Sequence, residues 1–153
     1  MNFMYLNKKY IIDIASVFFV AVFSFSINQY YGYMGIVPLD DFLNFNSGFR
    51  NLKGDIPFKD YYSITGPFLS VLQSFYFKIF GVNWFAFVLN ASILNCILSL
   101  SLFFLFKKFN ISNNLNVIFC SCIAILSYPN NGVPGVDHHT WIICVIGYLI
   151  FYT

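Results

Sequence analysis

The stretch Val82–Phe106, VNWFAFVLNASILNCILSLSLFFLF, decides the fold of this chain. It contains no charged residue, and a helix of this length reaches ~37 Å at ~1.5 Å per residue, more than the ~30 Å hydrocarbon core of a bilayer. Ser92, Asn95 and Ser99 recur at intervals of three and four residues, so we expect one polar stripe that faces other helices rather than lipid. The stretch therefore predicts a transmembrane helix.

The composition of the whole chain supports a membrane protein. Of its 153 residues, 59% are hydrophobic and only 9% are charged, and the mean hydropathy is +0.71. Such a chain has too few polar side chains to cover a water-soluble globule, and long apolar runs in this background indicate membrane spans. The net charge of +2 is small and dispersed. We therefore expect membrane lipid as a partner and no nucleic acid.

The apolar runs predict an all-α integral membrane protein with about four transmembrane helices. Their ranges are about 11–28, 82–106, 111–128 and 140–153. Between the first two spans we predict an external loop at 29–66 and an amphipathic helix at 67–80, which reaches only ~21 Å and would lie in the interface. The last run reaches Thr153 without a closing charged flank, so we expect the amino-terminal part of a longer protein.

Four lysines that flank the predicted spans fall on the same side, namely Lys8, Lys9, Lys107 and Lys108. The positive-inside rule makes that side the cytoplasm, and the amino terminus lies there too. The loop 29–66 and Asp137 then face the extracytoplasmic side.

The external loop contains four of the six acidic residues, in the stretch Pro38–Pro67, PLDDFLNFNSGFRNLKGDIPFKDYYSITGP. Its apolar residues recur with helical spacing at Phe42, Phe45, Phe49 and Leu52. The spacing predicts an amphipathic helix with Asp40 as its N-cap and Asp41 in its first turn. Two adjacent carboxylates at a membrane surface could also accept a proton from a nucleophilic hydroxyl. Capping and catalysis do not exclude each other.

The spaced residues of this loop resemble the first external loop of the polyprenyl-phosphate-sugar-dependent membrane glycosyltransferases. These enzymes have the GT-C fold and include the protein O-mannosyltransferase-like and lipid A aminoarabinose transferase-like groups. The matching positions are Asp40, Gly54, Pro57, Phe58, Asp60 and Pro67. The match covers the amino-terminal region only, and Asp41 stands where the family often has Glu.

The resemblance implies that residues 1–153 are the amino-terminal part of a glycosyltransferase domain in a bacterial inner membrane. The implied enzyme moves a sugar from an isoprenoid-phosphate donor to a hydroxyl of an acceptor glycan, lipid or protein, with inversion. Asp40 is implied as the catalytic base and Asp41 as a second acid beside it. Asp137, in the second external loop, is implied as a substrate ligand. The fragment could be inactive alone.

Three basic residues are candidates for binding the departing phosphate, because cations clamp phosphate oxygens. They are Arg50, Lys53 and Lys59, each of which could instead contact lipid headgroups or water. Asp60 is a further substrate-binding candidate in the same motif.

A metal site is the least supported of these predictions. Asp137-His138-His139 offers a carboxylate and two imidazoles, which could bind a divalent cation. Adjacent histidines on a helix point ~100° apart, so they rarely serve one ion. We therefore predict no metal site and keep His138 and His139 as weak candidates.

The alternative hypothesis is a non-enzymatic multi-span membrane protein, such as a transporter fragment or an assembly subunit. The acids would then cap helices, and the polar stripe of 82–106 would serve packing or a substrate path. A transporter predicts ionisable groups inside its spans. Apart from Asp13 near one end, the predicted spans have none.

Overall fold

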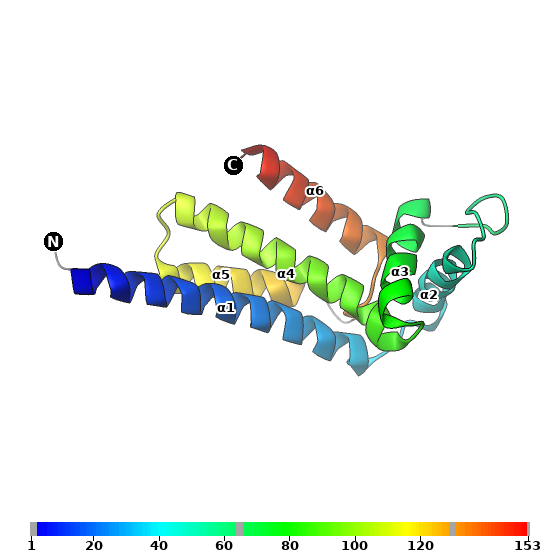
Figure 1. Ribbon diagram of the computed structural model, residues 1–153, viewed down its shortest axis with the longest axis horizontal. Coiled ribbons are helices and arrows are strands. Elements are labelled where there is room, and N and C mark those ends of the chain that lie inside the picture. Colours follow the sequence, from blue (N-terminus) through cyan, green and yellow to red (C-terminus); the bar gives the residue numbers. More distant parts are fainter. Residues whose placement is uncertain (1–2, 64–65, 129–130, 153) are drawn as a thin grey trace.

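The computed structural model is all-α. It describes residues 3–63, 66–128 and 131–152, with side chains from Tyr10 to Phe151 within these ranges. The described helices are α1 (Phe3–Met34), α2 (Pro38–Leu52), α3 (Pro67–Phe80), α4 (Trp84–Lys108), α5 (Asn113–Leu126) and α6 (Val136–Tyr152). Figure 1 shows α1, α4 and α5 side by side along the long axis, with α6 running back beside α4 at an angle. Helices α2 and α3 lie at one end of this bundle.

Two of the described helices are long and apolar enough to cross a membrane. They cover Tyr10–Met34 of α1 and Trp84–Lys108 of α4. Helix α4 begins where the Asn83 side chain accepts a hydrogen bond from the Ala86 amide at 2.8 Å, a typical N-cap. Because α1 and α4 contact each other and run in opposite directions, they form an antiparallel pair (Figure 1).

The prediction of four spans is corrected to two helices of sufficient length within the described residues. Helix α5 has 14 residues and α6 has 17, which correspond to ~21 Å and ~26 Å. The predicted span 111–128 included two residues at each end that are not helical in the structure. Asn110 adopts a left-handed φ of 56° before α5, and the helix ends at Leu126. The run predicted at 140–153 starts four residues earlier, at Val136.

The polar stripe on α4 is buried, as predicted. Ser92, Asn95 and Ser99 have 0% of their surface exposed. The Ser92 hydroxyl accepts a hydrogen bond from the Asn28 amide of α1 at 3.0 Å. The Asn95 amide donates to the Ala124 carbonyl of α5 at 2.9 Å. Polar side chains therefore join α4 to α1 and to α5, as is common between membrane helices.

Helix α3 has the bounds predicted from the sequence, Pro67–Phe80. Its polar face is turned into the protein, because Ser70 and Gln73 are buried while Phe68 and Phe75 are exposed. The aromatic side of the helix is therefore left uncovered.

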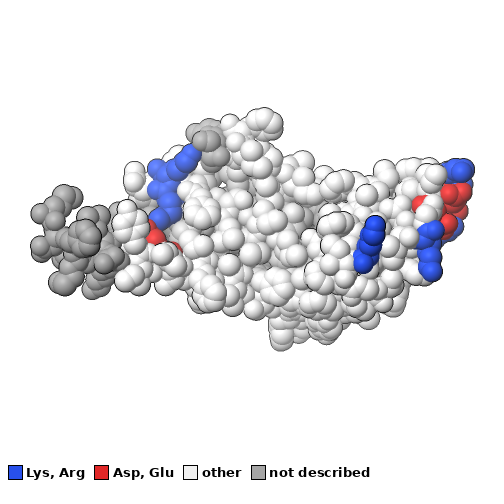
Figure 2. Space-filling model, in the orientation of Figure 1, with Lys and Arg blue, Asp and Glu red and all other residues white. Residues whose placement is uncertain are grey.

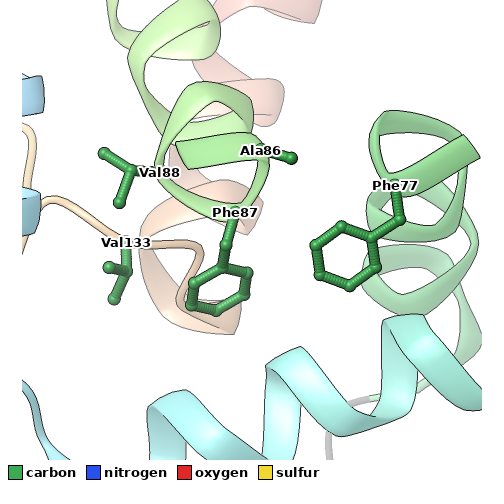
Figure 3. Close-up of a cluster of buried hydrophobic side chains, with 5 residues drawn as sticks. All are labelled: Phe77, Ala86, Phe87, Val88 and Val133. Carbon is green, nitrogen blue, oxygen red and sulfur yellow. The ribbon is translucent and has the colours of Figure 1, made fainter. Parts of the chain in front are cut away.

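An apolar cluster joins the bundle to the two helices at its end (Figure 3). It consists of Phe77 from α3, Ala86, Phe87 and Val88 from α4, and Val133 from the segment before α6. Phe45 of α2 packs on this cluster, with its ring centroid 4.8 Å from that of Phe77 and 5.4 Å from that of Phe87. This packing fixes α2 and α3 relative to the start of α4.

Charged side chains gather at the two ends of the molecule (Figure 2). At one end, Asp13 of α1 pairs with Lys107 of α4 at 2.6 Å. At the other end, Arg50 of α2 pairs with Asp55 at 2.8 Å. The surface between them is nearly free of charge in this view. A charge-poor middle between two charged ends suits a bundle inserted in a membrane.

Candidate acidic site between helices α2 and α6

Helix α2 begins at Pro38, with Val37 as its N-cap, so Asp40 is not the cap that the sequence predicted. Proline is favoured at the first helical position because its missing N–H would have no partner there. Asp40 and Asp41 both lie in the first turn. The Asp40 side chain is exposed, whereas only 2% of Asp41 is exposed.

Both carboxylate oxygens of Asp41 accept a hydrogen bond. Oδ2 accepts from the Val37 amide at 2.7 Å, which satisfies an N–H at the start of α2. Oδ1 accepts from Nδ2 of Asn131 at 2.9 Å. The second bond joins the start of α2 to the segment that precedes α6.

That segment has further contacts with the body of the protein. The Asn44 amide of α2 donates to the Pro134 carbonyl at 3.2 Å, and the Asn28 amide of α1 donates to the Gly132 carbonyl at 2.9 Å. Val133, between these two residues, is buried in the apolar cluster. Asp137 and His138 follow in the first turn of α6, so these contacts determine where they lie.

A cavity of about 420 Å³ opens between the start of α2 and the start of α6. Three carboxylates and one imidazole contribute to its walls, from Asp40, Asp41, Asp137 and His138. Amide and hydroxyl groups come from Asn44, Ser47, Tyr62 and Asn131. Among the described residues, neither lysine nor arginine lines it. The cavity can therefore accept hydrogen bonds from a polyhydroxyl ligand and take up a proton from it.

The basic residues predicted to bind phosphate lie outside this lining. The Arg50 guanidinium binds the Asp55 carboxylate and the Asp60 carbonyl at 2.8 Å each, and it lies 4.8 Å from the ring centroid of Tyr61. Arg50 therefore binds within its own loop.

The other candidates of this loop also lie away from the cavity lining. The Lys53 ammonium lies 5.4 Å from the ring centroid of Phe49, and Lys59 is exposed in a turn. The Asp60 carboxylate accepts a hydrogen bond from the Ile56 amide at 2.8 Å, which stabilises that turn.

The two adjacent histidines point to different places. His138 lines the cavity, whereas His139 is 2% exposed in the interior. Nδ1 of His139 lies 3.0 Å from the Tyr128 hydroxyl, and Nε2 lies 3.4 Å from Oδ1 of Asn90. Nδ2 of Asn90 donates in turn to Oε1 of Gln73 on α3 at 2.9 Å. Within the part of the chain that the structure describes, no three His, Cys, Asp or Glu side chains are grouped to bind a metal ion.

A second cavity, of about 260 Å³, lies between α3 and α6. Its walls are mostly apolar and come from Phe68, Leu69, Val136, His139, Thr140, Ile143 and Cys144. Val136 borders both cavities, so the apolar space adjoins the acidic one. Its only signal in the sequence is indirect, the spacing of four and three residues from Val136 through Thr140 to Ile143.

Asp40, Asp41 and Asp137 were predicted from the sequence as site residues, and all three line the same cavity. Asn44, Asn131 and Tyr62 also line it and were not predicted. Asn44 and Asn131 make hydrogen bonds between distant segments, which no local pattern indicates. The chain matches no protein-family model, no curated protein and no solved structure.

Proposed function

We propose that the protein is an integral membrane glycosyltransferase that moves a sugar from an isoprenoid-phosphate carrier to an acceptor hydroxyl. The observation that carries the proposal is the shared cavity of Asp40, Asp137 and His138. These residues come from segments about a hundred positions apart, at one end of a bundle whose middle is poor in charge. The acceptor is the hydroxyl of a glycan, a lipid or a protein.

Asp40 is the proposed general base, because its carboxylate is exposed at the cavity. The acceptor oxygen forms a bond to the anomeric carbon, and its proton passes to the Asp40 carboxylate. The bond between the anomeric carbon and the phosphate oxygen breaks, and the isoprenyl phosphate leaves with that electron pair. Attack from the face opposite the phosphate inverts the anomeric carbon. Asp137 and His138 are proposed to hold the sugar hydroxyls.

The apolar cavity between α3 and α6 supports an isoprenoid donor. It adjoins the acidic cavity at Val136, so a lipid chain in one could place its head at the other. The exposed aromatic side of α3 suits a helix at the membrane surface. We place α1 and α4 across the bilayer of a bacterial inner membrane, with α5 and α6 as shorter helices of the same bundle. Helices α2 and α3 lie at the extracytoplasmic surface.

The proposal is tested with Asp40→Asn in membranes of cells that express the complete reading frame. Farnesyl-phosphate-linked radiolabelled mannose, glucose and aminoarabinose serve as donors, and the label that leaves the lipid donor is counted. The variant should lose about 10²–10⁴-fold in rate, the usual contribution of a general base. Asp55→Asn is the matched control, since Asp55 lies in the same loop but does not line the cavity. Unchanged transfer by Asp40→Asn, or no transfer from any of these donors by the unaltered protein, would reject the proposal.

One observation favours the non-enzymatic alternative as a second candidate. Among the described residues, Oδ1 of Asn28, Oδ1 of Asn95 and Oγ of Ser99 are buried without a hydrogen-bond partner. Buried polar atoms are usually hydrated when protein partners are missing, so water could enter this seam of the bundle. A substrate path would need such hydration. Solute movement that Asn95→Leu abolishes, in a protein that transfers no sugar, would favour this candidate.

A further inference from the structure

We infer that Asp41 and Asn131 act together as positioning residues, and that Asp41 takes no part in proton transfer. Their hydrogen bond holds the segment before α6 against α2, and so places Asp137 and His138 opposite Asp40. The inference rests on the proposed function and assigns different roles to the two neighbouring aspartates.

The surroundings of Asp41 are those of a structural carboxylate. Both of its oxygens accept hydrogen bonds, from Val37 and Asn131, and 2% of the residue is exposed. A general base must come within hydrogen-bond distance of the substrate hydroxyl. The exposed Asp40 carboxylate can come within that distance of a ligand in the cavity, whereas both oxygens of Asp41 already accept hydrogen bonds. The amino-terminal end of α2 also favours the negative charge of Asp41.

The segment that Asp41 holds leads directly into the site. Asn131 precedes α6 by five residues, and Asp137 lies in the first turn of that helix. The Asn44–Pro134 hydrogen bond joins the same segment to α2. Loss of the Asp41–Asn131 bond would let the start of α6 shift relative to Asp40. A misplacement of about 1 Å can cost ~10²-fold in rate.

The amide of Asn131 is oriented by the charge of Asp41. A carboxylate only accepts hydrogen bonds, so Nδ2 of Asn131 must face it. Oδ1 of Asn131 is buried and has no hydrogen-bond partner among the described residues. This oxygen can therefore accept a hydrogen bond if the amide turns. The effect of losing the Asp41–Asn131 hydrogen bond can therefore be measured separately from the effect of losing the charge of Asp41.

Asp41→Asn removes the charge and can keep the bond. The new amide presents Oδ1 to the Val37 N–H and Nδ2 to Asn131, whose own amide turns so that its free Oδ1 accepts. Asp41→Ala removes both the charge and the bond. With the farnesyl-phosphate donors, we expect Asp41→Asn to stay within about threefold of the unaltered rate and Asp41→Ala to lose ~10²-fold. A second acid would lose activity in both variants, which would overturn the inference.

The exchanged pair Asp41→Asn with Asn131→Asp keeps every hydrogen bond while the charge moves to position 131. We expect it to retain transfer, whereas Asn131→Ala alone loses about as much as Asp41→Ala. The pH dependence of kcat should be unchanged in Asp41→Asn, because this side chain moves no proton. Asn51→Ala is the matched control, since Asn51 bonds from α2 to Ser74 of α3 instead. An inactive exchanged pair that is folded and inserted would overturn the inference.

A measurement without sugar separates this inference from the proposed function. Asp41→Ala, Asn131→Ala and the double variant are compared by thermal unfolding in detergent. The double variant should lower the midpoint by less than the sum of the two single changes, because both remove one bond. Additive effects overturn the positioning pair whatever the enzyme does. Coupled effects together with transfer that is unaffected by Asp40→Asn overturn the proposed function instead.

Discussion

The Asp13 carboxylate and the Lys107 ammonium lie 2.6 Å apart at the end of the bundle away from the acidic cavity (Figures 1 and 2). The two residues are 94 positions apart in the chain. Their contact fixes the register of α1 against α4 at the end where α4 finishes. Asp13, the one charged residue within the predicted spans, therefore has a protein partner.

We expect Asp13→Asn to lower the free energy of unfolding by no more than ~1 kcal/mol, because both side chains remain more than a quarter exposed, at 28% and 29%. Lys107→Met should cost about the same, and the double variant should cost no more than either. Unfolding in mixed micelles with rising dodecyl sulfate measures these changes. A decrease of several kcal/mol in the free energy of unfolding would contradict the partial exposure of this ion pair to water.

The lysines at the Asp13–Lys107 end of the bundle predict that this end faces the cytoplasm. Asn46 on α2 and Asn114 at the start of α5 are both exposed. Figure 1 shows α2 and the start of α5 at opposite ends of the molecule. With the exposed Cys122 and Cys144 replaced by Ser, cysteine at position 46 should react with an impermeant maleimide added outside the cell. Cysteine at position 114 should react only after permeabilisation. The reverse pattern would place the acidic cavity in the cytoplasm and contradict the proposed function.

Gly48 lets α2 and α3 approach closely. A Cβ at this position would lie 2.6 Å from Cγ and 2.8 Å from Cβ of Gln73. Gly48→Ala should therefore lower the free energy of unfolding by ~1–3 kcal/mol through overpacking. In α6, a Cβ on Gly147 meets nothing within 4 Å, so Gly147→Ala should stabilise by up to ~1 kcal/mol through helix propensity. Equal effects of the two changes would contradict the close packing of α2 on α3.

The apolar cavity can be filled from Cys144, which lines it. Cys144→Trp should raise KM for the farnesyl-phosphate donor by about tenfold or more, because the added ring takes the space assigned to the lipid chain. Cys122→Trp is the matched control, since Cys122 is also exposed but lies on α5 and lines neither cavity. An unchanged KM in Cys144→Trp would contradict the proposal that the lipid chain of the donor occupies this cavity.

The sequence predicted those features that depend on spacing within one element. The bounds of α3 and the buried stripe of Ser92, Asn95 and Ser99 follow from helical periodicity and are confirmed. The predicted N-cap at Asp40 is wrong, because Pro38 takes the first helical position and Val37 precedes it as the N-cap. The length of helix α5 was overestimated, because the hydropathy of a residue does not indicate where the backbone leaves the helix.

The cavity itself depends on contacts that no local pattern encodes. Asp137 is predicted as a site residue only by the resemblance to the glycosyltransferases. The contact between Asn131 and Asp41 joins residues 90 positions apart. Asn131 belongs to a turn-forming stretch whose Pro129 and Asn130 lie outside the described residues. Nothing in that stretch specifies which carboxylate the asparagine will meet, because the approach of α6 to α2 also depends on the packing of Val133 and Phe45 around the start of α4.

Four side chains are connected by hydrogen bonds whose donors and acceptors can be assigned in only one way for a neutral imidazole, namely Tyr128, His139, Asn90 and Gln73. Nδ2 of Asn90 already donates to Gln73, so its Oδ1 must accept from Nε2 of His139, and Nδ1 is left to accept from the Tyr128 hydroxyl. A single tautomer is thereby selected inside the protein. The nitrogen-15 resonances of this one ring would consequently report, without any substrate, whether α3 is seated on the bundle.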